Sequence, residues 1–315
     1  MNNLYTTVDI SGGLGNRLFQ LAYAIYFLRL SKKQKIKRRL VFAKSSVSSY
    51  WDTIFKGLFR IIADDEYNNI TFASYNSISP HKFIEPPSKA KEHIALKGKY
   101  ETFKYIGDTL REKMINIVYS NEDIMYPAYY KYRDILNYFG DNTKDDDMVS
   151  LHIRRADYSS PSSSPSSSYN YNLPMSYYAD ALRIVNKKNV VIFSNDIEWC
   201  INNFRDCVNS AKVAPLADYN IYYVSSKIFS EEELGSRAEI EFVLMSMFKH
   251  NIIANSYYSL WASFISYYKT KMVVAPKRWY SCDDSKENDE YAEYNEYAEY
   301  NEYAELYHKY ITHII

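Results

Sequence analysis

The chain has 315 residues, 47% of them hydrophobic, with 38 acidic and 38 basic side chains, so it is long enough for two globular domains. No run of about 18 apolar residues is present, and the first residues lack a basic region followed by an apolar stretch. We therefore expect neither a membrane span nor a signal peptide, and three cysteines without metal-ligand spacing favour a reducing, cytoplasmic location.

The charge is unevenly distributed. Residues 283–305 carry ten acids and one lysine, which leaves 28 acids and 37 lysines and arginines in the rest of the chain. A basic body suits an anionic ligand, and nucleic-acid binding is the alternative. The densest basic cluster, Lys32–Arg39, lacks interleaved aromatic residues, so we interpret it as a solvated helix end and expect no nucleic-acid partner.

The N-terminal segment predicts a strand, a glycine turn and a helix. Residues 4–10 have strand character, and Gly12, Gly13 and Gly15 make a flexible turn that Asn16 is able to cap before a helical pattern starts. This layout lets backbone amides approach a charged ligand. A tight turn without a ligand explains the spacing equally well, because it matches neither GxGxxG nor a Walker lysine motif.

The region up to residue 145 has the weakest structural signal. Short apolar runs at 40–43, 70–73 and around Leu96 predict strands, and a helix is expected within 102–119. The polar stretch 140–147 is typical of a domain linker. We therefore expect an N-terminal α/β domain over residues 1–145.

The stretch 148–158 reads MVSLHIRRADY and predicts a strand that ends at two arginines. Ligands of open α/β sheets bind beyond the carboxyl ends of the strands. Arg154 and Arg155 there indicate an anion, and the fork of a guanidinium matches a diphosphate. The alternative is a surface ion pair with Asp157.

Strands and helices alternate after the Ser/Pro tract 159–168, which is either a tolerated insertion or a functional lid. The alternation predicts a parallel, Rossmann-like sheet in a C-terminal domain over residues 146–282. The expected helices are 174–186, 197–204, 236–249 and 257–268, and the expected strands are 190–193, 252–254 and 272–275.

The final segment, 283–315, repeats EYAEYN. A three-residue period places the tyrosines on no single helix face, so we expect a solvated tail, with partner binding as the alternative. Its apolar end, 306–315, is able to dock back on the body.

Four stretches resemble the family 11 glycosyltransferases, the α-1,2-fucosyltransferases. They are GGLGNRLFQ at 12–20, HIRRADY at 152–158, VIFSNDIEWC at 191–200 and LMSMFKHNIIANSYYSLW at 244–261. The resemblance implies a GT-B-like fold with two Rossmann-like domains and a cleft between them. It also implies inverting transfer of fucose from GDP-fucose to a galactose-containing glycan, usually at O2, without a metal cofactor. The C-terminal domain then binds the GDP-sugar and the N-terminal domain the acceptor.

The resemblance also assigns roles to single residues. Arg154 matches the arginine that contacts the diphosphate, and His152 matches a nucleotide-contacting histidine, a buried structural imidazole being the alternative. Arg155 is the weaker ligand, because adjacent strand residues face opposite ways. Asp157 is a guess for the catalytic base. Asp196 matches an acid that binds the guanine edge, and a helix N-cap is its alternative role.

The remaining matches lie in loops. Gly12, Gly13, Gly15 and Asn16 resemble the motif that lines the cleft, and Ser256 and Ser259 resemble phosphate-side serines. The chain departs from the family pattern at four positions, which keeps open a catalytically weak or inactive relative that only binds glycans or nucleotides: Ala156, Asn195, Glu241 and Leu260.

Overall fold

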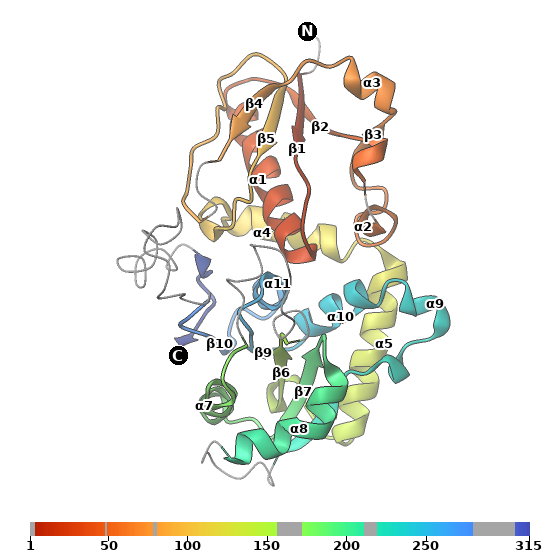
Figure 1. The fold of residues 1–315 in the computed structure, drawn as a ribbon, viewed down its shortest axis with the longest axis vertical. Coiled ribbons are helices and arrows are strands. Elements are labelled where there is room, and N and C mark those ends of the chain that lie inside the picture. The colour runs from red at the N-terminus through yellow and green to blue at the C-terminus, as the bar shows by residue number, and fades with distance from the viewer. Residues whose placement is uncertain (1–3, 48, 78–80, 156–171, 211–218, 280–305) are drawn as a thin grey trace. The chain divides into compact units, whose positions relative to one another are not determined.

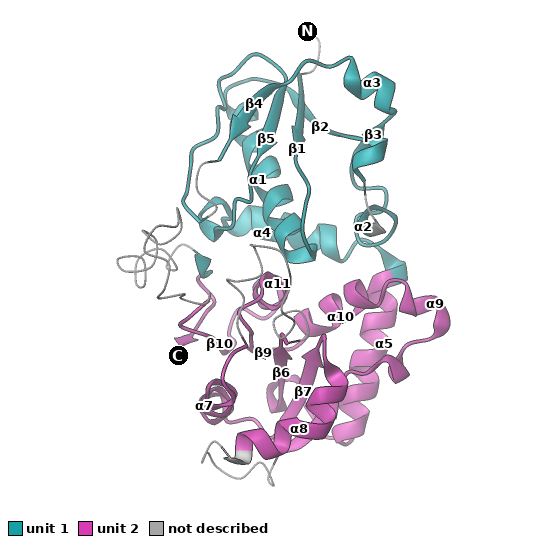
Figure 2. Cartoon of the chain, in the orientation of Figure 1, with its two compact units in different colours: residues 1–123, 300–308 teal, residues 124–299, 309–315 magenta. Residues whose placement is uncertain are grey.

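The computed structural model describes residues 4–47, 49–77, 81–155, 172–210, 219–279 and 306–315, which form two compact α/β units (Figure 1). Unit 1 comprises residues 1–123 with 300–308, and unit 2 comprises residues 124–299 with 309–315 (Figure 2). Each unit has its own parallel sheet, which confirms the predicted fold class of two Rossmann-like halves.

Unit 1 contains a five-stranded parallel sheet in the order β3-β2-β1-β5-β4. Helix α1 contacts β1 and β2, and the apolar residues that the helical pattern predicted, including Leu18, Leu21 and Ala22, are buried. The elements of this unit are β1 (Leu4–Val8), α1 (Leu14–Lys33), β2 (Arg38–Ala43), α2 (Ser49–Asp52), β3 (Arg60–Ile62), α3 (Asp64–Asn68), β4 (Ala73–Asn76), β5 (Ile94–Lys97) and α4 (Asp108–Val118).

Unit 2 contains a six-stranded parallel sheet in the order β11-β10-β9-β6-β7-β8. The central strand β6 is buried along its whole length, as expected of a parallel strand covered on both faces. The elements are α5 (Glu122–Phe139), β6 (Met148–Ile153), α7 (Met175–Val185), β7 (Asn189–Ser194), α8 (Ile197–Ser210), β8 (Asn220–Tyr223), α9 (Glu231–Leu234), α10 (Arg237–Ser246), β9 (His250–Ile252), α11 (Tyr257–Ile265), β10 (Val273–Ala275) and β11 (His313–Ile314).

The two units divide at Asp123–Ile124, near the start of α5, whereas the sequence placed the boundary at 145–146. The reason is that α5 packs within unit 2. The Tyr132 ring lies edge-on to Phe248 with centroids 5.1 Å apart, and the Lys131 ammonium pairs with Glu233 at 2.7 Å. The polar stretch 140–147 therefore connects α5 to β6 inside one unit.

The last seven residues correct the predicted extent of the tail. Strand β11 pairs in parallel with β10, with Val274 opposite His313 and Ala275 opposite Ile314. The Val273 amide donates to Thr312 Oγ1 at 2.9 Å. Residues 309–315 thus complete the edge of the sheet, as the docking alternative anticipated. The EYAEYN repeats and the Ser/Pro tract lie outside the described residues.

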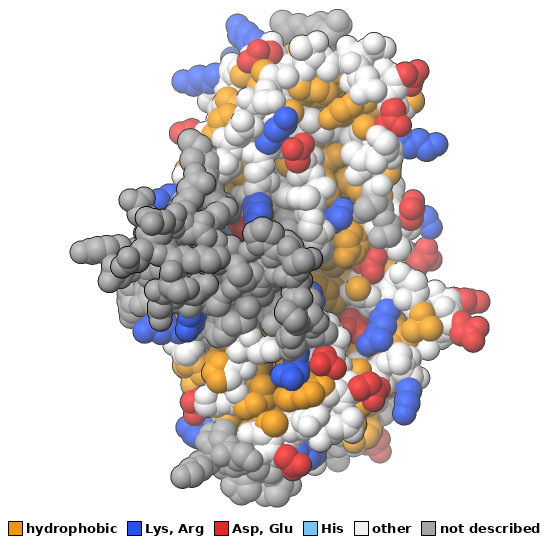
Figure 3. Space-filling model, in the orientation of Figure 1, with side chains coloured by type: hydrophobic (Ala, Val, Ile, Leu, Met, Phe, Trp, Pro, Cys, Tyr) orange, Lys and Arg blue, Asp and Glu red, His pale blue; other side chains and the backbone are white. Residues whose placement is uncertain are grey.

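The surface of the described residues mixes acidic and basic side chains on the face seen in Figure 3. Within the same residues, no helix is both long enough and apolar enough to cross a membrane.

Candidate functional site

Three neighbouring strands of unit 2 end at one edge of its sheet. Strands β9, β6 and β7 are adjacent and parallel, so their carboxyl ends meet there. Strand β6 is followed by Arg154 and Arg155, β7 by Asn195 and Asp196, and β9 by a short turn that leads to Ser256. The structure therefore gathers most of the sequence-predicted residues at this edge.

His152 lies near the end of β6 and is 4% exposed. Burial, and secondly the positive charge of Arg154, lower the pKa of His152 to about 3, so its imidazole is neutral at neutral pH. Its Nδ1 has no hydrogen-bond partner among the described residues, and its ring lies 5.7 Å from that of Tyr258. A buried, unpaired ring nitrogen favours ligand contact over the satisfied structural imidazole. Arg154 follows the strand directly and is half-buried.

Arg155 is directed toward the turn between β7 and α8. Its backbone amide donates to Asn195 Oδ1 at 2.9 Å, and its Nε lies 3.6 Å from Asp196 Oδ2. Its guanidinium carbon lies 3.9 Å from the centre of the Trp199 ring. Among the described residues the Asp196 carboxylate contacts Arg155 and no backbone amide of α8, so it does not act as a helix N-cap.

The two predicted serines differ in their surroundings. Ser256 is the N-cap residue of α11 and is half-buried, and its side chain makes no capping hydrogen bond. Ser256 therefore stands at the N-terminus of a helix, a position at which the helix dipole favours an anion. Ser259 is fully buried, and its hydroxyl donates to the Ser256 carbonyl at 3.2 Å. This hydrogen bond lies within the first turn of α11, which Ser259 therefore stabilises.

In unit 1 the glycine turn joins β1 to α1. The N-cap of α1 is Gly13, which corrects the expectation for Asn16. Asn16 lies inside the helix and donates from Nδ2 to Glu101 Oε1 at 2.9 Å. Gly12 has φ +77°, and a Cβ there would lie 3.1 Å from the Asn16 side chain. Gly15 is buried in the first turn.

The structure adds residues that the sequence did not single out. Trp199 lies on α8, three residues after Asp196. This spacing predicts that both side chains lie on the same side of the N-terminal end of the helix. Tyr258 next to His152 is held by a 2.6 Å hydrogen bond from its hydroxyl to the Ala238 carbonyl. Glu101, 2% exposed, carried no local signal, because its partner Asn16 is distant in the sequence.

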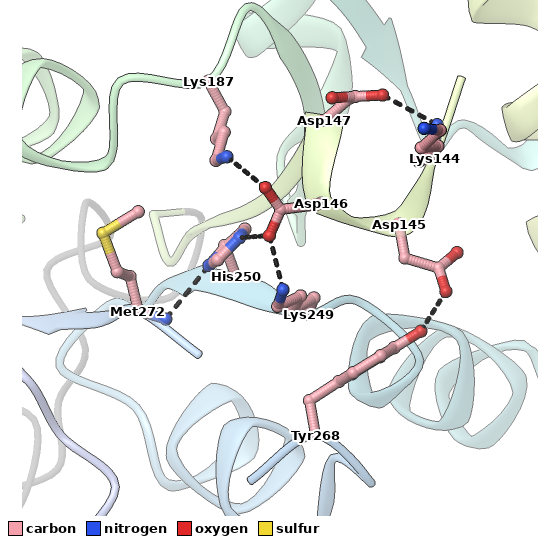
Figure 4. Close-up of polar contacts among 9 residues, drawn as sticks. All are labelled: Lys144, Asp145, Asp146, Asp147, Lys187, Lys249, His250, Tyr268 and Met272. Atoms are coloured by element: carbon pink, nitrogen blue, oxygen red, sulfur yellow. Dashed lines mark hydrogen bonds and ion pairs between the residues drawn. The ribbon is translucent and has the colours of Figure 1, made fainter. Parts of the chain in front are cut away.

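The candidate base Asp157 and the three consecutive aspartates that end the polar stretch 140–147 do not join this edge in the described residues. Asp157 lies outside the described residues. Asp145, Asp146 and Asp147 precede β6 at the amino edge of the sheet, where hydrogen bonds occupy their carboxylates (Figure 4). Within the described part of the chain, no group of three or more His, Cys, Asp or Glu side chains is arranged to hold a metal ion.

Comparison with known proteins gives a family and two curated relatives. A family model described as glycosyl transferase family 11 matches residues 4–299. The O-antigen biosynthesis glycosyltransferase WbnK of Escherichia coli is 27% identical, with 86% of this chain and 94% of that protein covered. An alpha-1,2-colitosyltransferase of Escherichia coli is 24% identical, with 89% and 94% covered.

Two solved structures show a weaker overall likeness. A variant of Arabidopsis thaliana FUT1 in complex with GDP superposes with a TM-score of 0.46 at 10% identity, covering 84% of this chain and 69% of that one. POFUT1 in complex with GDP superposes with a TM-score of 0.41 at 10% identity, covering 84% and 94%.

Proposed function

The chain belongs to glycosyl transferase family 11, and we propose on this premise that it transfers fucose from GDP-fucose to a hydroxyl of a galactose-containing glycan. Inversion at the anomeric carbon would give an α-1,2 linkage. The observation that carries the donor part of the proposal is the carboxyl edge of the unit 2 sheet, where His152 lies near the end of β6 and Arg154, Asp196 and Ser256 follow three adjacent strands.

Stabilisation of the leaving diphosphate is the main catalytic requirement of this reaction. Glycosyl transfer passes through an oxocarbenium-like transition state in which negative charge grows on the leaving group. Arg154 supplies a permanent cation, and the Ser256 hydroxyl at the N-terminus of α11 supplies a hydrogen-bond donor. Metal-independent catalysis is part of the proposal, with Arg154 in the place of a cation. The neutral imidazole of His152 contacts the nucleotide without adding charge.

Base recognition falls to Asp196. A carboxylate accepts from N1–H and the N2 amino group of guanine together, which suits a side chain at a strand end that caps no helix. On the acceptor side we assign the turn Gly12–Asn16 and the N-terminus of α1. Asp157, directly after the arginine pair in sequence, remains the candidate for the base that deprotonates the acceptor hydroxyl.

A second donor is suggested by the name of one relative, an alpha-1,2-colitosyltransferase. Colitose is fucose without one ring hydroxyl, so the two GDP-sugars share their nucleotide and differ at one position. A binding protein without transfer activity is the remaining alternative, motivated by the departures at Ala156, Asn195, Glu241 and Leu260.

A donor and acceptor screen tests the proposal. The purified chain is incubated with GDP-fucose, GDP-colitose, GDP-mannose and UDP-galactose, each with lactose and related galactosides. GDP release is measured, and the product linkage is determined by NMR. We expect a product from GDP-fucose with an α-1,2 linkage. A product from GDP-colitose alone would assign the second donor, and GDP binding without any transfer would assign the binding protein.

A further inference from the structure

We propose that Arg155 and Trp199 are positioning residues that orient the Asp196 carboxylate for guanine, so that they set nucleobase specificity while Arg154 serves the diphosphate. The inference rests on the proposed function, because it presumes a GDP-sugar donor. It gives a separate task to Arg155, which the sequence marks only as the weaker ligand of the two neighbouring arginines.

Three contacts join Arg155 to the residues that follow β7. Its amide is bound by Asn195, its Nε lies 3.6 Å from Asp196, and its guanidinium lies 3.9 Å from the centre of the Trp199 ring. That separation is well inside the roughly 6 Å range of cation–π attraction. A planar, weakly hydrated guanidinium suits simultaneous contact with a ring and a carboxylate, which a lysine does not reproduce.

Helix geometry explains why Trp199 contributes. The residue lies in the first turn of α8, and side chains of a helix lean toward its N-terminus. The ring is thereby brought over the turn that carries Asp196, where it meets the Arg155 guanidinium. Fixing the guanidinium against the ring fixes the charge that faces Asp196 Oδ2.

The Asp196 carboxylate is only partly engaged by the protein. Its side chain is 33% exposed, and among the described residues the carboxylate meets only Arg155, at a distance beyond direct hydrogen bonding. Both oxygens therefore keep lone pairs for the two donors of a guanine edge. Its backbone amide donates to Ser194 Oγ at 3.0 Å, which holds the main chain of the turn.

Nucleotide selectivity tests the inference. Isothermal titration calorimetry on the full chain gives the Kd of GDP, of IDP, which lacks the N2 amino group, and of GMP, which lacks the β-phosphate. Since a hydrogen bond to a charged group contributes about 1.5–3 kcal/mol, the unsubstituted chain should prefer GDP over IDP by about tenfold or more. Trp199→Leu and Arg155→Lys should reduce that preference to about twofold while leaving the GDP-to-GMP ratio unchanged, because a disordered Asp196 loses most of that bond.

Two further variants sharpen the test. Trp199→Phe keeps a ring under the guanidinium and should retain most of the GDP-to-IDP preference. Arg60→Lys is the matched control in unit 1, because Arg60 also lies over a ring, 6.0 Å from the centre of Tyr5, and pairs with Glu66 at 3.3 Å. This control should change neither ratio.

Two results with the variants would overturn the inference alone. Loss of the GDP-to-GMP preference with an intact GDP-to-IDP preference would assign Arg155 to the diphosphate. An equal loss of affinity for all three nucleotides would reduce the contact to a structural one. Absence of GDP binding by the unsubstituted chain would overturn the proposed function itself and the inference with it, so the two failures are distinguishable.

Discussion

His250 donates from Nε2 to Asp146 at 3.2 Å, because its Nδ1 accepts from the Met272 amide at 3.0 Å (Figure 4). The same carboxylate receives the ammonium groups of Lys187, at 2.7 Å, and Lys249. These residues stand at the amino ends of β6, β7, β9 and β10. Asp146 therefore joins four neighbouring strands at the edge opposite the candidate site, and its role is structural.

Replacing Asp146 should weaken unit 2 without touching the candidate site. Asp146→Asn removes the negative charge to which Lys187, Lys249 and His250 donate. We expect a loss of about 1–2 kcal/mol in the free energy of unfolding, because three contacts to one carboxylate stabilise more than a single exposed ion pair. Urea unfolding followed by circular dichroism measures the loss. Asp180→Asn is the control, since Asp180 has a similar side-chain exposure, 49% against 51%, and a single ion-pair partner, Arg183, in the described part of the chain. Equal effects of the two substitutions would contradict the network.

Acid should destabilise the protein through two of its buried histidines, His152 and His250. Burial lowers the pKa of both His152 and His250 in the folded chain from the usual 6.5, so the unfolded chain binds more protons. Their contribution is complete above pH 6.5 and is lost as the pH falls below it. Each histidine adds about 1.4 kcal/mol per pH unit to the slope where it is protonated only in the unfolded chain.

The measurement is urea unfolding between pH 7 and pH 5, above the range of ordinary carboxylates. His250→Asn should flatten the dependence, since one of the two histidines is removed from the linkage. The effect persists at high salt if burial is its main cause, as the order of causes for His250 indicates. An unchanged slope in the variant would be inconsistent with this assignment.

Part of the fold of unit 2 was predictable, because strands such as β7, with its run Val190–Phe193, are rich in apolar residues and alternate with amphipathic helices. Strand β7 and helices α7 and α11 lie close to their predicted ranges. The missed elements have weaker patterns. Strand β8 has one buried residue in four, and α5 contains Pro127, which obscured a helix that the tertiary packing of Tyr132 and Ile135 stabilises.

The candidate site was predictable where one strand end carries the chemistry and unpredictable where it depends on contacts between strand ends. His152 and Arg154 follow from β6 alone. Arg155 points to Asp196 because β7 lies next to β6, and no local pattern contains that adjacency. The pairing of Asn16 with Glu101 likewise arises from the adjacency of β1 and β5.

The glycine turn of unit 1 should tolerate substitution unequally. Gly12→Ala places a Cβ at φ +77° and 3.1 Å from Asn16, and should cost about 1–2 kcal/mol of stability. Gly13→Ser should be close to neutral, because Gly13 has φ −74°, no atom lies within 4 Å of an added Cβ, and serine is a preferred N-cap. Thermal unfolding of both variants checks the difference, and the reverse order would refute the geometry of the turn.

Arg154 is the residue whose loss should affect transfer most. Removing one electrostatic stabiliser of a developing charge costs about 2.7–4 kcal/mol, so Arg154→Ala should lower kcat by about 100- to 1,000-fold with the fold intact. Arg154→Lys keeps the positive charge but loses the two-pronged guanidinium. Its kcat should therefore lie between that of Arg154→Ala and that of the unsubstituted chain. Initial rates of GDP release with a saturating acceptor give kcat, and circular dichroism confirms the fold. Arg183→Ala, which removes an exposed arginine of α7 paired with Asp180, is the control and should retain full activity. Full activity in Arg154→Ala would remove Arg154 from the mechanism, and the cation facing the leaving diphosphate would then have to come from another residue.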